Sequence, residues 1–461
     1  MEGSEGLSQA IAEHVAGFRA DDLSASTIHA AKRALLDGMG VMLAASGASP
    51  EVAPFIDYAT SQGRGSATIL GTGLRTSAAM AAFANGAMAH ALDFEDAFDA
   101  APCHPNASLL PAALAVAETG PLTTGRELLA AIAIGCDLVC RIGLSLRREM
   151  EAGGWYPPPI LGAFGAVAAA ARLRHLSPEQ VRDAFSLILC QVTMPGEIKY
   201  SRDTVIRAVR EAFPAQAAVQ ASTLAQSGVR GFEAPFEGKA GFFRLYAEDQ
   251  YDPAALRDGL GERFWIEQLS FKRWPACRGT HAYIEAAQRL RARHAIDPAS
   301  IIAIVATGGE VQRMLVEPAD RKQAPTTVID AKFSIPFTIG TALIDDDVTL
   351  ESFEGGALCD ERKRELAGLV QFEQRLDWGR SRAASGGLAI ELANGARHED
   401  WIDIAAGDAS RPIDDAALAE KFKNCAARAA KPLNASGIER LASAVWGLDA
   451  AGDAAKSLFA E

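Results

Sequence analysis

Carboxylates and an imidazole gather in a short acidic loop between two alanine-rich stretches. The loop carries Asp93, Glu95, Asp96 and Asp99 and ends at His104. The flanking stretches have apolar residues at helical spacing, so these side chains meet where one helix ends and the next begins. A carboxylate and an imidazole at such a junction suit general acid–base chemistry. The plain alternative for Asp93 is a solvent-facing residue at a helix C-terminus.

A second set of cations precedes a predicted helix, in the run Lys-Arg-Trp-Pro-Ala-Cys-Arg-Gly-Thr-His at residues 272–281. Lys272 and Arg278 have the charge to bind carboxylates. His281 begins the helix, whose N-terminal dipole favours an anion and lowers the pKa of an imidazole, keeping it available as a base near neutrality. The alternative is a histidine at a helix start that takes no part in chemistry.

A third set lies between these two. Lys199 and Arg202 precede Arg207 and Arg210, which are three residues apart and therefore share one helical face. That face is either solvated or a carboxylate clamp, for which the guanidinium fork is well suited. Upstream, Tyr156 stands before three prolines and is either a packing residue or a proton donor.

These segments resemble the MmgE/PrpD family, which includes 2-methylcitrate dehydratases, cis-aconitate decarboxylases and iminodisuccinate epimerases. The family's His-Ala-Leu-Asp-Phe-Asp-Asp-Thr-His is similar to residues 90–98, and its Phe-Lys-x-x-Pro-x-Cys-x-x-x-His is similar to residues 271–281. His104 with the next proline matches a further His-Pro of the family. The resemblance implies that Asp93, His104, Lys272 and His281 are catalytic.

The chain departs from the family pattern around the same pocket. Ala97 and Phe98 stand where the family has Thr and His, and Tyr156 stands where it has His. Arg207 and Arg210 replace Lys and His. These changes point away from 2-methylcitrate dehydratase itself. We predict Tyr156 as a fifth catalytic residue, and as substrate-binding residues Lys199, Arg202, Arg207, Arg210 and Arg278.

The elements that must position these residues are mostly helices. Apolar spacing predicts helices through most of the first 264 residues, with the clearest start at Ser177, where an N-cap, an N1 proline and Gln180 form a capping box. From about residue 265 short β-rich runs appear. We therefore expect a mainly α protein with an α+β second domain: a helical domain over 1–264, an α+β lid domain over 265–400, and C-terminal helices over 401–461 that return to the helical domain. The resemblance implies the same division.

Composition and charge exclude several classes of binding partner. The chain has 461 residues and a formal net charge of −13, which argues against nucleic acid because phosphate binding needs a basic face. We expect no apolar stretch to reach the roughly 20 residues that span a bilayer, and therefore a soluble, cytoplasmic protein. Nucleotide, serine-hydrolase and zinc-protease motifs are absent from the sequence. We expect no cofactor and no metal, because the cysteines lack paired metal spacing and the acidic loop lacks a calcium-loop pattern.

The function expected from these residues is a cofactor-independent lyase, dehydratase-like or decarboxylase-like, that removes a proton next to a carboxylate of a small di- or tricarboxylate. An epimerase acting on an iminodisuccinate-type substrate is the first alternative, and a non-catalytic carboxylate-binding homologue is the second. Alanine-rich helices and the family resemblance together predict a homodimer.

Overall fold

Helices fill the first half of the chain, as the spacing of apolar residues predicts. The computed structural model describes residues 6–201 and 204–459. These residues divide into two units, so the expected combination of a large helical part and a smaller α+β part is confirmed. Unit 1 comprises residues 1–91, 101–269 and 414–461, and unit 2 comprises residues 92–100 and 270–413. The sequence analysis placed the second domain at 265–400; it did not foresee that residues 92–100 lie in unit 2, because nothing local to that segment marks the crossing.

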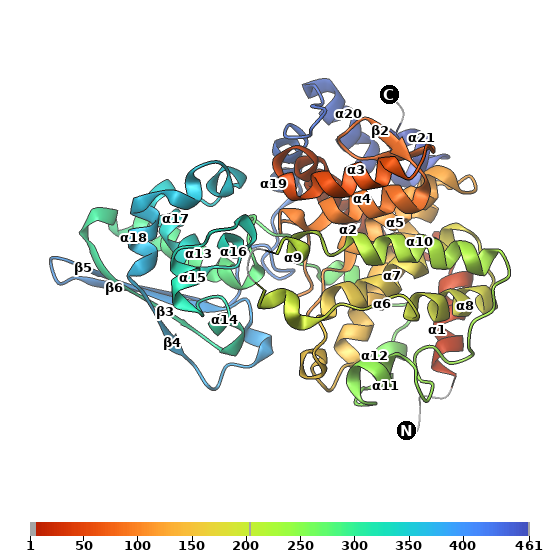
Figure 1. Ribbon diagram of the computed structural model, residues 1–461, viewed down its shortest axis with the longest axis horizontal. Helices are drawn as coiled ribbons and strands as arrows, with labels where there is room; N and C mark the ends of the chain where they lie inside the picture. The colour runs from red at the N-terminus through yellow and green to blue at the C-terminus, as the bar shows by residue number, and fades with distance from the viewer. Residues whose placement is uncertain (1–5, 202–203, 460–461) are drawn as a thin grey trace. The chain divides into compact units, whose positions relative to one another are not determined.

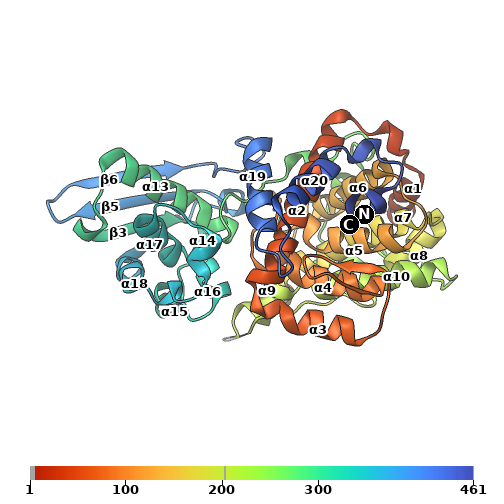
Figure 2. The same ribbon diagram turned by 90° about the horizontal axis from the view of Figure 1, so that it is seen from above.

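Unit 1 is built from helices and one small hairpin (Figures 1 and 2). Its helices are α1 Leu7–Gly17, α2 Ala25–Ala48, α3 Ala53–Ser61, α4 Ala78–Ala91, α5 Pro105–Thr119, α6 Gly125–Ser145, α7 Pro157–Leu173, α8 Pro178–Leu189, α9 Ile206–Val209, α10 Ala212–Gln226, α11 Phe242–Ala247, α12 Pro253–Arg257, α19 Asp415–Ala426, α20 Ala435–Trp446 and α21 Ala454–Phe459. Strands β1 Ala67–Ile69 and β2 Leu74–Thr76 pair antiparallel.

Helix α7 lies at the centre of unit 1, where it packs against α5, α6, α8 and α10 (Figure 1). Every residue of α7 is buried, and alanine and glycine make most of its surface small. Gly135 of α6 faces Gly165 of α7 so closely that a Cβ on either would lie within 2.6 Å of the other's carbonyl oxygen. The two glycines therefore set the distance between these helices.

The predicted helix signals are present where the sequence marks them most strongly. Ser177 and Gln180 form the capping box of α8. The C-terminal helix α19 packs on α2, so the end of the chain belongs with the helical unit.

Helix α6 is long and apolar enough to cross a membrane by length and composition, so the expectation that no apolar stretch reaches this length is wrong. However, 94% of its apolar window is buried inside the protein. It also carries the buried ion pair between Asp137 Oδ2 and Arg141 Nε, which are 2.5 Å apart. These properties are typical of a core helix.

Unit 2 has a four-stranded sheet in the order β4-β3-β5-β6, with β3 parallel to β4 and antiparallel to β5, and β5 antiparallel to β6. The strands are β3 Ile301–Gly308, β4 Val370–Gln374, β5 Gly386–Leu392 and β6 Arg397–Ile402. The helices are α13 His281–His294, α14 Glu310–Arg313, α15 Ala319–Gln323, α16 Val328–Lys332, α17 Ile335–Asp345 and α18 Glu361–Gly368. Helix α13 packs on β5 and β6, and α17 packs on α13 (Figure 1).

Local residue types account for several element boundaries. The glycine-rich stretch over 63–76 forms the β1–β2 hairpin. Pro214 lies in the first turn of α10, where proline is tolerated because the first N–H groups of a helix have no partner within it. A break separates α16 from α17, and Ser334 caps the second of them.

Candidate active site

A buried ion pair anchors the polar cluster of unit 2. Lys272 Nζ lies 2.6 Å from Asp93 Oδ1 and donates a second hydrogen bond, of 2.9 Å, to the carbonyl oxygen of Asp93. Neither side chain is exposed by more than 1%. Asp93 follows the end of α4 with a φ of 48°, a left-handed conformation that aspartate tolerates better than most residues but that still costs energy. Strained backbone of this kind is held where the surroundings fix it.

The charge of Lys272 is secured by its neighbours. Burial alone opposes the ammonium, but the negative charges of Asp93 and Glu95 outweigh it, and the pKa of Lys272 lies above its usual value. The lysine is therefore a permanent cation at neutral pH rather than a proton shuttle.

Arg278 is held by the protein on every side. Its Nε donates to Asp99 at 2.9 Å, its Nη2 donates to the carbonyl of Ala405 at 3.1 Å, and its Nη1 donates to the carbonyl of Ala406 at 2.7 Å. Each nitrogen therefore already has a protein acceptor, and substrate binding by Arg278 stays a prediction. In this arrangement the residue ties three loops of unit 2 together.

His281 is completely buried, and its contacts define its tautomer. Nε2 lies 3.1 Å from the carbonyl of Ala276, which can only accept, so Nε2 carries the proton. Nδ1 lies 3.3 Å from Nη1 of Arg278, which can only donate, so Nδ1 has the lone pair. Burial, followed by the positive charges of Arg278 and Lys272, lowers the pKa of His281 well below its usual value. The direction agrees with the sequence expectation, although the main cause is burial.

One residue of this cluster was missed in the sequence. Lys332, at the end of α16, is buried and donates from Nζ to the carbonyls of Leu92 at 2.6 Å and Pro275 at 3.1 Å. It thereby joins the segment before Asp93 to the loop after Lys272. The available signal was a lysine within an otherwise apolar run, and such a residue needs acceptors if it is buried.

Unit 1 has its own polar cluster, centred on Arg210, which is fully buried. Arg210 Nε donates to Glu211 Oε1 at 3.0 Å, and its Nη1 makes a short hydrogen bond to Nε2 of His90. Because a guanidinium only donates, Nε2 of His90 is an acceptor and that ring is neutral. Ser108 donates to the other oxygen of Glu211. Glu211 was not predicted, although an Arg-Glu pair before an alanine-rich helix was visible.

The remaining predicted residues of unit 1 surround this cluster. The ring of Tyr156, which caps α7, has Lys199 Nζ and the Arg210 guanidinium each 5.1 Å from its centroid. The ring of His104, the N-cap of α5, lies 5.2 Å from that of His90. Arg207 is buried, and its carbonyl accepts from Arg210 at 2.8 Å. The structure thus brings five predicted residues of this unit together, while Arg202 lies outside the described residues.

The two clusters offer different chemistry. Unit 2 supplies a charged lysine, a carboxylate and a neutral imidazole in buried surroundings, where charge stabilisation is strong. Unit 1 supplies buried cations around a phenol, as binding of a carboxylate requires. A metal would have to compete with Arg210 for Nε2 of His90.

A helical unit and an α+β unit, each with buried cations beside a neutral histidine, define a protein with the groups for acid–base chemistry on an anion. The chain belongs to the MmgE/PrpD family: residues 9–254 match the MmgE/PrpD N-terminal domain and residues 274–445 match the C-terminal domain.

Three relatives are similar over 96% of the chain. Cis-aconitate decarboxylase of Homo sapiens is 26% identical over 92% of its own length. Cis-aconitate decarboxylase-like protein oryM of Aspergillus oryzae is 24% identical over 95% of its length. Cis-aconitate decarboxylase of Aspergillus terreus is 22% identical over 93% of its length.

Proposed function

We propose that this protein is a lyase that acts on a small di- or tricarboxylate without a cofactor, removing either a carboxylate or a proton next to one. The observation that carries the proposal is the similarity, over nearly the whole chain, to relatives named cis-aconitate decarboxylases. The buried Lys272–Asp93 pair supports it, because a reaction that leaves an electron pair on carbon needs a fixed positive charge close by.

The residues of unit 2 are assigned separate roles in the proposed reaction. Lys272 stabilises negative charge that develops on the substrate, and Asp93 keeps that lysine charged and oriented. His281 is neutral and contacts Arg278, so its first role is to position that loop; it takes up a proton only when the contact opens. Lys199, Arg207 and Arg210 of unit 1 are assigned to the carboxylates of the substrate.

The test is turnover by the purified protein in deuterated water, followed by proton NMR, with cis-aconitate, citrate, 2-methylcitrate and an iminodisuccinate-type substrate. A decarboxylase releases carbon dioxide and leaves deuterium at the carbon, whereas a dehydratase forms or consumes an alkene. Asp93→Asn, which keeps an acceptor for Lys272 but removes its counter-charge, should lose turnover and also lower the unfolding temperature, so its turnover is measured well below that temperature. If none of the four substrates reacts while calorimetry still detects binding, the protein is a non-catalytic carboxylate-binding homologue.

Epimerisation is the second candidate, and Tyr156 is the observation that favours it. Its ring centroid lies 5.1 Å from Lys199 Nζ and 5.1 Å from the Arg210 guanidinium, so the phenol stands beside the two cations assigned to the carboxylates of the substrate. An epimerase needs two acid–base groups on opposite faces of one carbon, and Tyr156 would supply one of them. In the same NMR assay an epimerase incorporates deuterium without net loss of substrate.

The protein is further proposed to work as a homodimer in the cytoplasm. The described part of unit 1 presents aromatic residues that are half exposed, among them Tyr58 and Phe213. A second copy of the chain that covers them would remove this apolar surface from water.

No metal is expected to take part. Dialysis against a chelator should leave turnover within about twofold of its starting value, because the proposed charge stabilisation comes from Lys272 and the arginines. Activity that disappears with chelator and returns with one divalent ion would contradict this expectation.

A further inference from the structure

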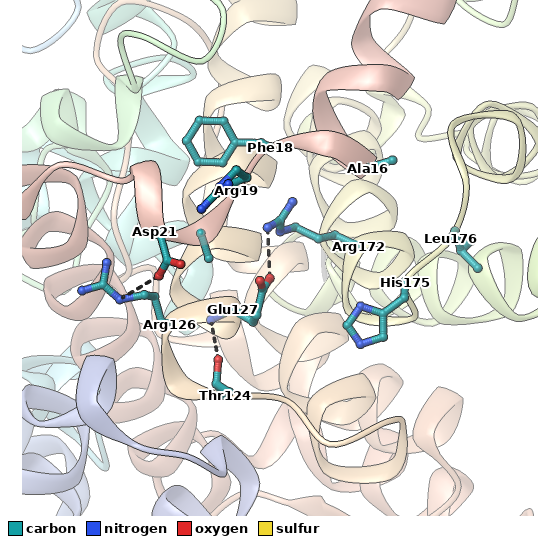
Figure 3. Close-up of a pocket in the computed structure, with 11 residues that line it drawn as sticks. Ala16, Phe18, Arg19, Asp21, Thr124, Arg126, Glu127, Arg172, His175 and Leu176 are labelled. Carbon is teal, nitrogen blue, oxygen red and sulfur yellow. Dashed lines mark hydrogen bonds and ion pairs between the residues drawn. The ribbon is translucent and has the colours of Figure 1, made fainter.

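A hollow of about 690 Å³ lies in unit 1 among the end of α1, the start of α6 and the end of α7 (Figure 3). Its size falls in the range of small-molecule sites. None of its lining residues belongs to the polar cluster around Arg210. The hollow is therefore a feature that the proposed reaction does not use.

Positive side chains reach this hollow from three separate segments. Arg19 follows α1, Arg126 begins α6 and Arg172 ends α7; His175 lies just beyond Arg172. The lining also holds two carboxylates, Asp21 and Glu127. Three arginines against two carboxylates leave one net positive charge, in a chain whose own net charge is −13.

Arg172 is the fixed cation of the hollow. Its side chain is only 6% exposed. Nη1 donates to the carbonyl of Val15 at 3.0 Å and Nη2 donates to Glu127 Oε2 at 3.0 Å, while Nε has no hydrogen-bond partner. Figure 3 shows the guanidinium extending between Arg19 and Glu127. A buried donor of this kind gains more from an acceptor than an exposed donor would.

The other cations are free to move toward a ligand. Arg126 Nε lies 4.0 Å from Asp21 Oδ1 across the surface, and the side chain of Asp21 is 75% exposed. Such exposed pairs contribute little and are exchanged easily. Thr124 caps α6, with its Oγ1 accepting from the backbone of Glu127 at 3.2 Å, so the positive end of a 21-residue helix faces the same hollow.

The pKa of Arg172 is consistent with binding of a further anion beside it. Burial lowers the pKa of Arg172 although Glu127 opposes the shift, so the single carboxylate does not fully offset the cost of burying the charge. A second negative group would complete the offset.

We propose that this hollow binds a small organic anion through a phosphate or carboxylate group that contacts Arg172 and Arg126. The group lies near the start of α6 and contacts the guanidinium of Arg172, whose buried Nε has no hydrogen-bond partner. Phe18 and Leu176 give the remainder of the ligand an apolar wall. The site is separate from the residues assigned to substrate, and the proposal does not depend on the reaction.

The experiment is isothermal calorimetry of the full-length protein with three probes: inorganic phosphate, adenosine monophosphate and citrate. Hydrogen exchange locates the binding, with slower exchange expected in residues 16–21 and 124–127. Adenosine monophosphate as the tightest probe identifies a phosphate ester, and citrate as the tightest identifies a carboxylate. The absence of binding by all three at millimolar concentration overturns the proposal.

Two variants are expected to change the affinity for the anion in opposite directions. Arg126→Gln should weaken binding by roughly tenfold or more, the usual effect of losing one charge-assisted hydrogen bond. Glu127→Gln keeps an acceptor for Arg172 but removes a negative charge, so it should tighten binding. Arg244→Gln, a partly exposed arginine of α11, is the matched control and should change nothing. Equal affinity in all variants would overturn the site, whatever the outcome of the turnover assays.

Discussion

At the scale of single residues, hydrogen-bond direction decides the protonation of both central histidines. His281 accepts from Arg278 and donates to Ala276, and His90 accepts from Arg210, so each ring is neutral. A neutral histidine with a low pKa is a weak base that is always in its basic form. The histidine best matched by sequence is thus ready to accept a proton only when Arg278 moves.

We expect His281→Ala to lower turnover by at least about a hundredfold while the fold is retained, the usual effect of removing an acid–base group. His281→Gln is the informative companion, because an amide can replace both hydrogen bonds but cannot transfer a proton. Rescue by glutamine assigns His281 to positioning, and equal loss in both variants assigns it to proton transfer. Near-normal kinetics of the alanine variant would exclude both roles.

Tyr156→Phe separates the two candidate reactions. Assayed with single enantiomers in deuterated water, a two-base epimerase should become one-sided: it still exchanges the proton of one enantiomer but no longer interconverts them. A lyase that uses Tyr156 only for packing between Lys199 and Arg210 should keep its kinetics within a few-fold, because phenylalanine keeps the ring. Unchanged reaction of both enantiomers would remove the main support for epimerisation.

The sequence predicted which charged residues belong to the candidate site, but not which atoms form their hydrogen bonds and ion pairs. Residue patterns and the family resemblance selected Asp93 and Lys272, which the structure pairs at 2.6 Å. They also selected Arg278 as a substrate ligand, which stays a prediction, but they gave no sign of its contacts with Asp99, Ala405 and Ala406. Carbonyl groups from residues more than a hundred positions away cannot be read from a local motif. Lys332 was missed for the same reason.

At the scale of elements, capping and turn chemistry predicted boundaries well, whereas tertiary contacts decided the rest. The Ser177 capping box, a local signal, is present and begins α8. Strand β4 was not predicted, because its parallel partner β3 lies 66 residues earlier in the chain, where Ile304 pairs with Val370 and Gly308 pairs with Gln374. A parallel partner leaves no turn signal in the sequence.

Packing of α1 against α7 and α8, which buries His14, should make the protein sensitive to acid. Burial, with the charges of Arg141 and Arg172, lowers the pKa of His14 to about 4. The unfolded chain binds this proton near pH 6.5, so stability is lost as the pH falls from about 6.5 toward 4, by up to roughly 3 kcal/mol. The lowered pKa of His281 acts in the same direction.

We therefore expect His14→Phe, which keeps a ring against Phe18 and Phe264, to flatten the dependence of the unfolding free energy on pH between 6.5 and 4. Urea unfolding at several pH values measures it. His29→Phe, at a half-exposed histidine on α2, is the control. An identical pH profile for His14→Phe and the unchanged protein would show that His14 does not titrate in this way.

At the scale of the whole molecule, the described part of unit 1 exposes an aromatic patch, in which Phe55, Tyr58 and Phe213 contact the buried ring of Phe83. The ring of Phe83 lies 5.2 Å from that of Phe55, 5.7 Å from Tyr58 and 5.8 Å from Phe213. Tyr58 is 50% exposed and Phe213 is 46% exposed. Aromatic rings in mutual contact at the surface are enriched in interfaces between proteins, where they bury large areas.

If this patch is where two copies meet, a charge within it should separate them. We expect light scattering to give a dimer mass for the unchanged protein and a monomer mass for Phe213→Glu. Burying an unpaired carboxylate in an apolar interface costs more free energy than burial of the surrounding aromatic surface provides. Leu376→Glu places the same charge at an exposed leucine of unit 2 and should leave the dimer intact. A monomer mass for the unchanged protein at micromolar concentration rejects the dimer, and a dimer mass for Phe213→Glu moves the interface to another face.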